Sequence, residues 1–183
     1  MQLYNSFLRY GFVAKTFHWV MFVVIVFLLL VDPLTDSFPR GSDQRFFIVW
    51  LHQSLGLTVF MLVIMRLLWK WINPKPTYPE SMPIWQQRLS SVVHGILYTL
   101  ILLQPIAGVL TVISRGRDAH FFGIFSIPGF EQSNDSLREV AWFLHHDIFG
   151  KALMGFILFH LLASLYHHFI VKDNILKKMT WGA

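Results

Sequence analysis

The sequence predicts an all-α protein, an integral membrane bundle of four helices. Hydrophobic residues make up 55% of its 183 residues and charged residues only 14%, a balance typical of membrane proteins. Four apolar stretches are each long enough to cross a bilayer, and segments rich in helix-breaking residues separate them. We therefore predict one four-helix transmembrane unit over residues 1–183, with spans at about 11–31, 46–71, 89–113 and 140–170.

The composition also limits which metal sites and cofactors the chain can hold. The chain has no cysteine, which excludes disulfides, iron–sulfur clusters and covalent c-type haem attachment. A bound metal would therefore need histidine, methionine, carboxylate or backbone oxygen ligands, and histidine is abundant. The formal net charge is +5, which basic residues beside membrane spans explain without a nucleic-acid partner. The expected surroundings are a lipid bilayer.

The first two spans follow a polar, aromatic N-terminal segment. Residues 17–31 carry no formal charge and form the core of the first span. A cleaved signal peptide is the alternative, but no small-residue cleavage site precedes Asp32, and a histidine in the apolar core would be unusual. Residues 32–45 are predicted to be a loop. The second span then carries His52 near its start and Arg66 near its end.

The third and fourth spans enclose the longest connection. Residues 73–88 contain four prolines and must link two helices, and Pro105 is expected to kink the third span. Residues 114–139 are rich in aromatic residues, glycine and proline, which suggests a lid on the membrane surface. The fourth apolar segment, 142–170, holds five of the nine histidines, and a basic tail follows it.

Basic residues indicate the orientation. The side that contains both termini and the 72–88 connection carries nine Lys and Arg residues against two acids. The opposite side carries six basic residues and eight of the ten acids. By the positive-inside rule both termini are predicted to be cytoplasmic, and the chain is predicted to be a multi-pass protein of the bacterial inner (cytoplasmic) membrane.

Four histidines fall at two matched depths in this topology. His18 and His160 lie toward the cytoplasmic side, and His52 and His146 lie toward the external side. His146 and His160 are 14 residues apart, so on a helix they leave from nearly the same face, about 21 Å apart. Ionisable residues inside a membrane are functional candidates by default. We predict two ligand pairs, His18 with His160 and His52 with His146.

Haem is the cofactor that best fits such pairs. Carboxylates are absent from the spans except for Asp147 near one end, so a di-iron or di-zinc site lacks ligands. Two opposed imidazoles leave four equatorial positions, which a porphyrin fills, and the product is suited to one-electron transfer. His145 is the alternative to His146, although it faces about 100° away on a regular helix. An imidazole that merely bonds a neighbouring helix is the simpler interpretation of any single histidine.

The sequence resembles the bacterial four-helix di-haem cytochrome b561 proteins over essentially its whole length. The matching segments are KTFHW around His18, WLHQSLG around His52, VVHGILY around His94, SRG at 114–116, and LHHDIFG and FHLLASLYHHFIVKDNIL in the last span. This resemblance implies two haem b groups, held by the same two pairs of histidines.

In length and loop pattern the sequence is similar to the superoxide oxidase branch, which passes electrons from external superoxide through both haems to ubiquinone. This resemblance implies that Arg115 and Arg117 attract the anion, with Arg40 and Arg45 adding to the field. His167 and Lys172, with His94 and His168 behind them, are the implied quinone-binding residues. Lys151 departs from the family pattern.

Lys151 lies four residues after Asp147, so the two are expected to pair; a haem propionate is the other candidate partner.

Two other functions compete with the oxidase. One is a cytochrome subunit that relays electrons between a dehydrogenase or hydrogenase partner and the quinone pool. A redox partner protein and a homodimer are the two associations that the sequence leaves open. A transporter using the same histidines is a further alternative, but the broken helices and inverted repeats typical of transporters are absent from the sequence.

Overall fold

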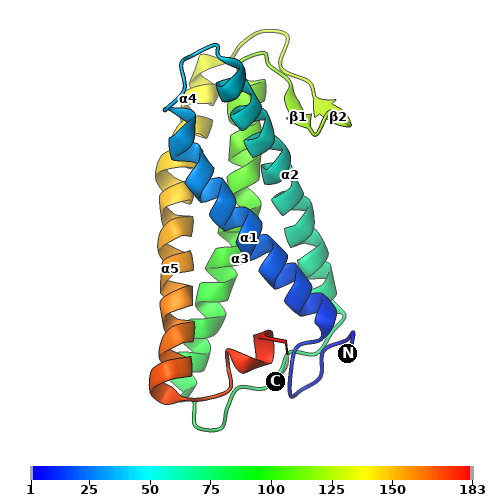
Figure 1. Ribbon diagram of the computed structural model, residues 1–183, viewed down its shortest axis with the longest axis vertical. Helices are drawn as coiled ribbons and strands as arrows, with labels where there is room; N and C mark the ends of the chain where they lie inside the picture. The colour runs from blue at the N-terminus through cyan, green and yellow to red at the C-terminus, as the bar shows by residue number, and fades with distance from the viewer. Residues whose placement is uncertain (1, 182–183) are drawn as a thin grey trace.

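A computed structural model of the protein describes residues 2–181, and four long helices run along its length (Figure 1). The first three are α1 (Phe12–Thr35), α2 (Asp43–Trp71) and α3 (Ile84–Ile113). The fourth is one continuous helix formed by α4 (Asp135–Phe143), η1 (Leu144–Gly150), α5 (Lys151–Tyr166) and η2 (His167–Val171). All four are long and apolar enough to cross a membrane. The predicted all-α membrane bundle is confirmed.

The second and fourth helices extend beyond their apolar runs because their polar first turns are capped. The Ser42 hydroxyl accepts the N–H of Arg45 at 3.3 Å at the start of α2. The Asn134 side chain accepts the N–H of Leu137 at 2.9 Å at the start of α4. Such caps satisfy backbone donors that a helix leaves unpaired. Hydropathy therefore locates the membrane-spanning part, and the caps locate the ends.

The core lies between the four helices, and its buried side chains are aliphatic apart from one methionine. Neighbouring helices pack in chain order, α1 on α2, α2 on α3, and α3 on the fourth helix. The buried side chains that meet at the centre are Met21, Ile25, Val59, Val63, Val93, Leu97, Leu100 and Leu153. Many large apolar side chains instead point outward from the bundle. Such a surface would be a liability in water and is normal against lipid.

One end of the bundle, the terminal end, holds both chain termini (Figure 1). Residues 2–11, 72–83 and 172–181 cover it, with the short helix η3 (Lys177–Met179) in the last segment. The Asn5 backbone N–H donates to the Asn73 side chain at 3.1 Å. The Trp19 indole donates to the Met179 carbonyl at 2.8 Å, and the buried ammonium of Lys15 donates to the Thr180 carbonyl at 2.6 Å.

The opposite end, the hairpin end, is covered by two short antiparallel strands, β1 (Ala119–Phe121) and β2 (Phe125–Ile127), with His120 opposite Ser126. The hairpin is fixed to α2. The Ser54 hydroxyl, which is fully buried, donates to the His120 carbonyl at 3.3 Å and accepts the Phe122 N–H at 2.9 Å. The predicted surface lid is therefore attached next to His52.

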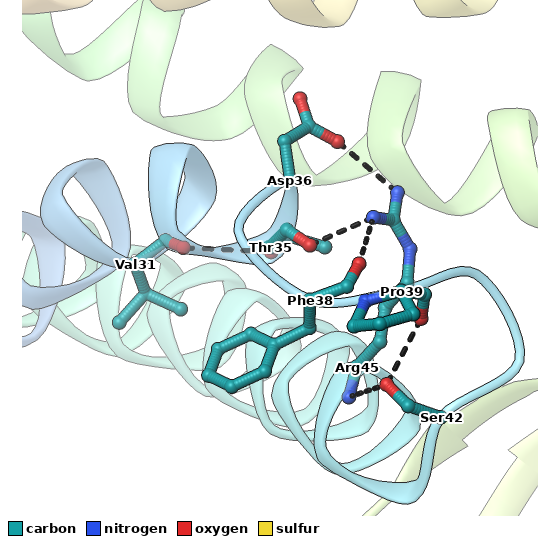
Figure 2. A network of polar contacts seen from close by, with 7 residues as sticks. All are labelled: Val31, Thr35, Asp36, Phe38, Pro39, Ser42 and Arg45. Atoms are coloured by element: carbon teal, nitrogen blue, oxygen red, sulfur yellow. Dashed lines mark hydrogen bonds and ion pairs between the residues drawn. The ribbon is translucent and has the colours of Figure 1, made fainter.

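The turn between α1 and α2 lies at the hairpin end and is closed by Arg45 (Figure 2). Its guanidinium donates to the carbonyls of Thr35 at 2.7 Å and Phe38 at 3.2 Å, and pairs with the Asp36 carboxylate at 3.1 Å. These bonds satisfy carbonyls left free at the end of α1. Arg45 is thus mainly a structural residue, because a local acid offsets the charge that was expected to add to the external field.

Candidate functional site

Six of the histidines form two groups, one toward each end of the bundle. At the terminal end, the ring of His160 on α5 lies 6.2 Å from that of His18 on α1 and 5.1 Å from that of His94 on α3. At the hairpin end, the ring of His52 on α2 lies 6.1 Å from that of His145 on η1. All these distances join ring centroids.

The two cross-helix separations suit a shared metal ion. A metal–imidazole bond is about 2 Å long, so two imidazoles on opposite sides of one ion place their ring centroids roughly 6 Å apart. The observed 6.2 Å for His18–His160 and 6.1 Å for His52–His145 agree with that geometry. Nowhere in residues 2–181 do three His, Cys, Asp or Glu side chains gather to hold a bare ion. The pairs therefore fit a metal that brings its own equatorial ligands, as haem does.

The helix geometry explains why His145 approaches His52. On a regular α-helix the 14-residue spacing would align His146 with His160. The segment 144–150 is instead a π-helix, whose wider turn accommodates one extra residue. A separation of 15 residues then returns to nearly the same face. The ring of His146 lies 4.9 Å from that of His145 and 4.7 Å from the indole of Trp142.

The ring of His145 is held from the side of α3. Its Nδ1 bonds the carbonyl oxygen of Gln104 at 2.8 Å, and the Gln104 amide donates to the His145 carbonyl at 3.0 Å. Gly108 leaves room for the ring, since a Cβ there would lie 2.8 Å from the His145 Cε1. A carbonyl partner on Nδ1 is the usual device that fixes a ligating imidazole and directs Nε2 to the metal. The sequence analysis missed Gln104 and Gly108, although a polar residue and a glycine stand out there in an apolar span.

A cavity of about 250 Å³ lies between the helices at this level. Its wall includes residues from all four helices, among them His52, Gly56, Gln104, His145, His146 and Gly150. The two glycines are the small residues that follow His52 and His146 by four positions. Both histidines of the 145–146 pair thus line the same space, and either can present an imidazole to it.

A second cavity, of about 260 Å³, opens beside the first and is lined by Arg115, Arg138, Glu139 and Trp142. Burial lowers the pKa of the Arg115 guanidinium, and the positive charges of Arg138 and Arg117 lower it further. The predicted pair Arg115 and Arg117 therefore belongs to a cluster of three arginines. Arg138 also lies 3.6 Å from Asp135 and 3.7 Å from Glu139, which moderates its charge.

The SRG segment is built to hold Arg115 in place. Ser114 is fully buried, and its carbonyl accepts the Asn134 N–H at 2.8 Å. Gly116 has φ +71°, a conformation that favours glycine. Gly129 packs directly on the backbone of residues 116 and 117, where a Cβ would come within 2.4 Å. Sequence analysis missed Arg138 and Trp142, because only the fold brings them next to Arg115.

The predicted quinone-binding residues do not form one compact group. His94 lies with His18 and His160, and its Nδ1 bonds the Ser90 carbonyl at 2.6 Å. His167 instead bonds the Asp173 carboxylate at 2.5 Å, and both side chains are nearly buried. Lys172 lies between them in sequence, in a left-handed conformation that ends the fourth helix.

The pairing expected for Lys151 is present. Its ammonium lies 2.6 Å from the Asp147 carboxylate, one turn away on the same helix. The extra positive charge beside the cavity is therefore compensated locally. His120 lies in β1, and its backbone fixes the hairpin to α2.

Comparisons with known proteins agree with this arrangement. The family model described as prokaryotic cytochrome b561 matches residues 9–182. Cytochrome b561 homolog 2 of Escherichia coli K12 is 28% identical over 181 residues, covering 98% of this chain and 95% of its own. Cytochrome b561 homolog 1 of the same organism is 28% identical over 164 residues, covering 88% and 91%.

A further relative, the probable superoxide oxidase CybB of Yersinia pestis, is 29% identical over 175 residues, covering 93% of this chain and 95% of its own. The family implies binding of haem b and electron transfer by a multi-pass membrane protein, with which the four apolar helices and the paired histidines agree. The chain belongs to the prokaryotic cytochrome b561 family.

Proposed function

We propose that this protein is a superoxide:ubiquinone oxidoreductase, a superoxide oxidase that holds two haem b groups in one bundle. The observation that carries the proposal is the duplication of one geometry. Two cross-helix imidazole pairs, with ring centroids 6.2 Å and 6.1 Å apart, lie toward opposite ends of the same membrane-spanning helices. Haem supplies reversible one-electron chemistry, and the chain sets its position, surroundings and access.

The inner haem is assigned to His18 and His160, and the outer haem to His52 and one histidine of the 145–146 pair. For that last ligand, the 14-residue spacing to His160 favours His146. The ring separation from His52 and the bond to the Gln104 carbonyl favour His145. Alanine variants of each, compared by haem content and low-temperature electron paramagnetic resonance, identify the ligand as the one whose loss removes the outer low-spin signal.

The hairpin end is proposed to face the periplasm and the terminal end the cytoplasm, in the inner membrane. The excess of Lys and Arg on the side of both termini supports this orientation. Superoxide would then meet the cluster of Arg115, Arg117 and Arg138 beside the outer haem site. Each superoxide gives up one electron and leaves as dioxygen, so no proton is needed at this end.

Ubiquinone is the proposed acceptor at the terminal end. Its reduction to quinol takes two electrons, supplied by two superoxide ions, and two protons from the cytoplasmic side. His167, Lys172 and His94 are the proposed quinone-binding residues. The hydrogen bond between His167 and the Asp173 carboxylate supports a role in proton supply, because it places two groups that can carry a proton side by side at the terminal end.

Rapid mixing of the purified protein with superoxide, in the absence of free dioxygen, tests the function. We expect the absorption bands of both haems to change to those of the reduced form, and added ubiquinone to reverse the change. Two haems that ignore superoxide would contradict the oxidase and favour a subunit that relays electrons from a dehydrogenase or hydrogenase. A protein that binds no haem would contradict the whole proposal.

A further inference from the structure

Two positive charges lie at the terminal end of the bundle next to the inner histidine group, Arg66 partly buried and Lys70 exposed. Arg66 on α2 is partly buried, and its Nε donates to the Tyr98 hydroxyl on α3 at 3.1 Å. The Lys70 ammonium, one turn further along α2, lies 4.7 Å from the centre of the Tyr98 ring. Tyr98 in turn follows His94 by four residues, so both project from the same face of α3.

Arg66 faces the centre of the bundle. Its charge lies close enough to act electrostatically on the rings of His18, His94 and His160, and the charge of Lys70 acts on His94. A basic residue that merely marks the cytoplasmic side would extend toward the headgroups. The hydrogen bond to Tyr98 instead holds the guanidinium between two helices, at the level of the inner ligand pair.

Neither cation is paired with an acid in the part of the chain that the structure describes. The ion pairs found there involve Arg45, Arg138, Lys151 and His167. Tyrosine hydroxyl and ring contacts do not neutralise a charge in a low-dielectric setting, and charges in a membrane are normally paired. For Arg66, which is partly buried, the missing partner is therefore an anion that residues 2–181 do not supply.

We propose that Arg66 and Lys70 bind the propionate carboxylates of the inner haem, an inference that rests on the haem assignment proposed above. Haem b carries two carboxylates at one edge, and Arg66 offers a fork of N–H donors suited to one of them. Their positive charge would offset the carboxylates and favour the ferrous state of the iron. The two residues thus help to set the potential of the inner haem.

Redox titration of the purified holoprotein in detergent tests this inference. In Arg66→Leu we expect the inner haem to shift about tenfold toward the ferric state, a change of about 59 mV for one electron, with the outer haem unchanged. Arg66→Lys should keep most of the wild-type potential because it retains the charge. Arg88→Leu is the matched control, since it removes an exposed charge elsewhere on the same end.

Infrared difference spectra of protein loaded with haem labelled with ¹³C at its propionates give a second readout. We expect the labelled carboxylate bands to move in Arg66→Leu and in Tyr98→Phe, and to stay in Arg88→Leu. Unmoved bands with an unchanged inner potential would overturn the inference. Loss of a co-purified anionic lipid, without any effect on haem, would overturn it in favour of a phosphate headgroup. A wild-type protein without haem would instead contradict the proposed function.

Discussion

The two ends of the bundle share one geometry and differ in almost everything around it. Each holds a cross-helix pair of imidazoles with ring centroids about 6 Å apart. At the hairpin end the pair borders a cavity of about 250 Å³, with an arginine-lined cavity beside it. At the terminal end a third histidine crowds the pair, and three segments of chain cover it.

The comparison of the two ends indicates which features would give the two proposed haems different roles. The residue types and the spacing of the two histidine pairs are nearly the same, so under the proposed function they would not distinguish a haem that accepts electrons from one that passes them on. The surrounding charges can. Lys151 at the hairpin end is paired with Asp147, whereas Arg66 at the terminal end has only Tyr98 as its hydrogen-bond partner in residues 2–181. Access and local charge would therefore give each haem its role.

The largest expected effect comes from removing one ligand at one end. His52→Ala should lose the outer haem and His160→Ala the inner one, so that each variant keeps about half of the wild-type haem, because an iron with one imidazole is held less tightly. Haem-to-protein ratios and the low-spin resonance signals measure this. His120→Ala, in the hairpin, serves as the control. Loss of both haems from either variant would show that the two ends do not bind haem independently.

A smaller effect is expected from the arginine cluster. Arg115→Ala should slow reduction of the outer haem by superoxide about tenfold at low ionic strength and flatten its salt dependence, because the cluster attracts the anion electrostatically. Arg40→Ala, which removes an exposed arginine at the same end, should have little effect. Equal losses in the two variants would mean that overall charge matters and the cluster does not.

The same cluster has a defined response to pH. Burial and the charges of Arg138 and Arg117 lower the pKa of Arg115, so Arg115 loses its proton at a lower pH than an isolated arginine does. Any loss of rate from this source must appear as the pH rises, and it cannot appear as the pH falls.

Some features of the fold and the candidate site could be predicted from the sequence, and others could not, because they depend on different kinds of sequence pattern. The four helices could be predicted because a bilayer requires long apolar runs, and the depths of His18, His52 and His160 follow from their positions in those runs. The approach of His145 to His52 could not be predicted, because it depends on one extra residue in the turn at 144–150. Helical periodicity at a constant 3.6 residues per turn contains no sign of such a π-helix.

Contacts between segments far apart in the sequence could not be predicted either. Arg138 and Trp142 meet Arg115 only because α3 and α4 pack together, and no spacing rule connects their positions. Arg45 illustrates the opposite error, since an arginine near the external face looked available for an anion and instead closes a turn. For these arginines the sequence indicates the positive charge, but it does not indicate which group the charge contacts.

The smallest predicted effect tests the support that α3 gives to the outer site. In Gly108→Ala the new Cβ would lie 2.8 Å from the His145 ring, so the ring must move by a few tenths of an ångström. We expect a small change in the resonance signal and potential of the outer haem, and a destabilisation of about 1 kcal/mol. Gly95→Ala is the matched control on the same helix, because a Cβ there meets nothing within 4 Å.

Both substitutions give α3 the same gain in helix propensity, so a difference between them reports the contact with His145. A change confined to the outer haem in Gly108→Ala would mean that the exact position of this ring matters to the iron. If the resonance signal and potential of the outer haem are unchanged in both Gly108→Ala and His145→Ala, then His145 only joins two helices. The π-helix would then leave His146, whose ring lies against Trp142 beside the arginines, as the ligand closest to the donor.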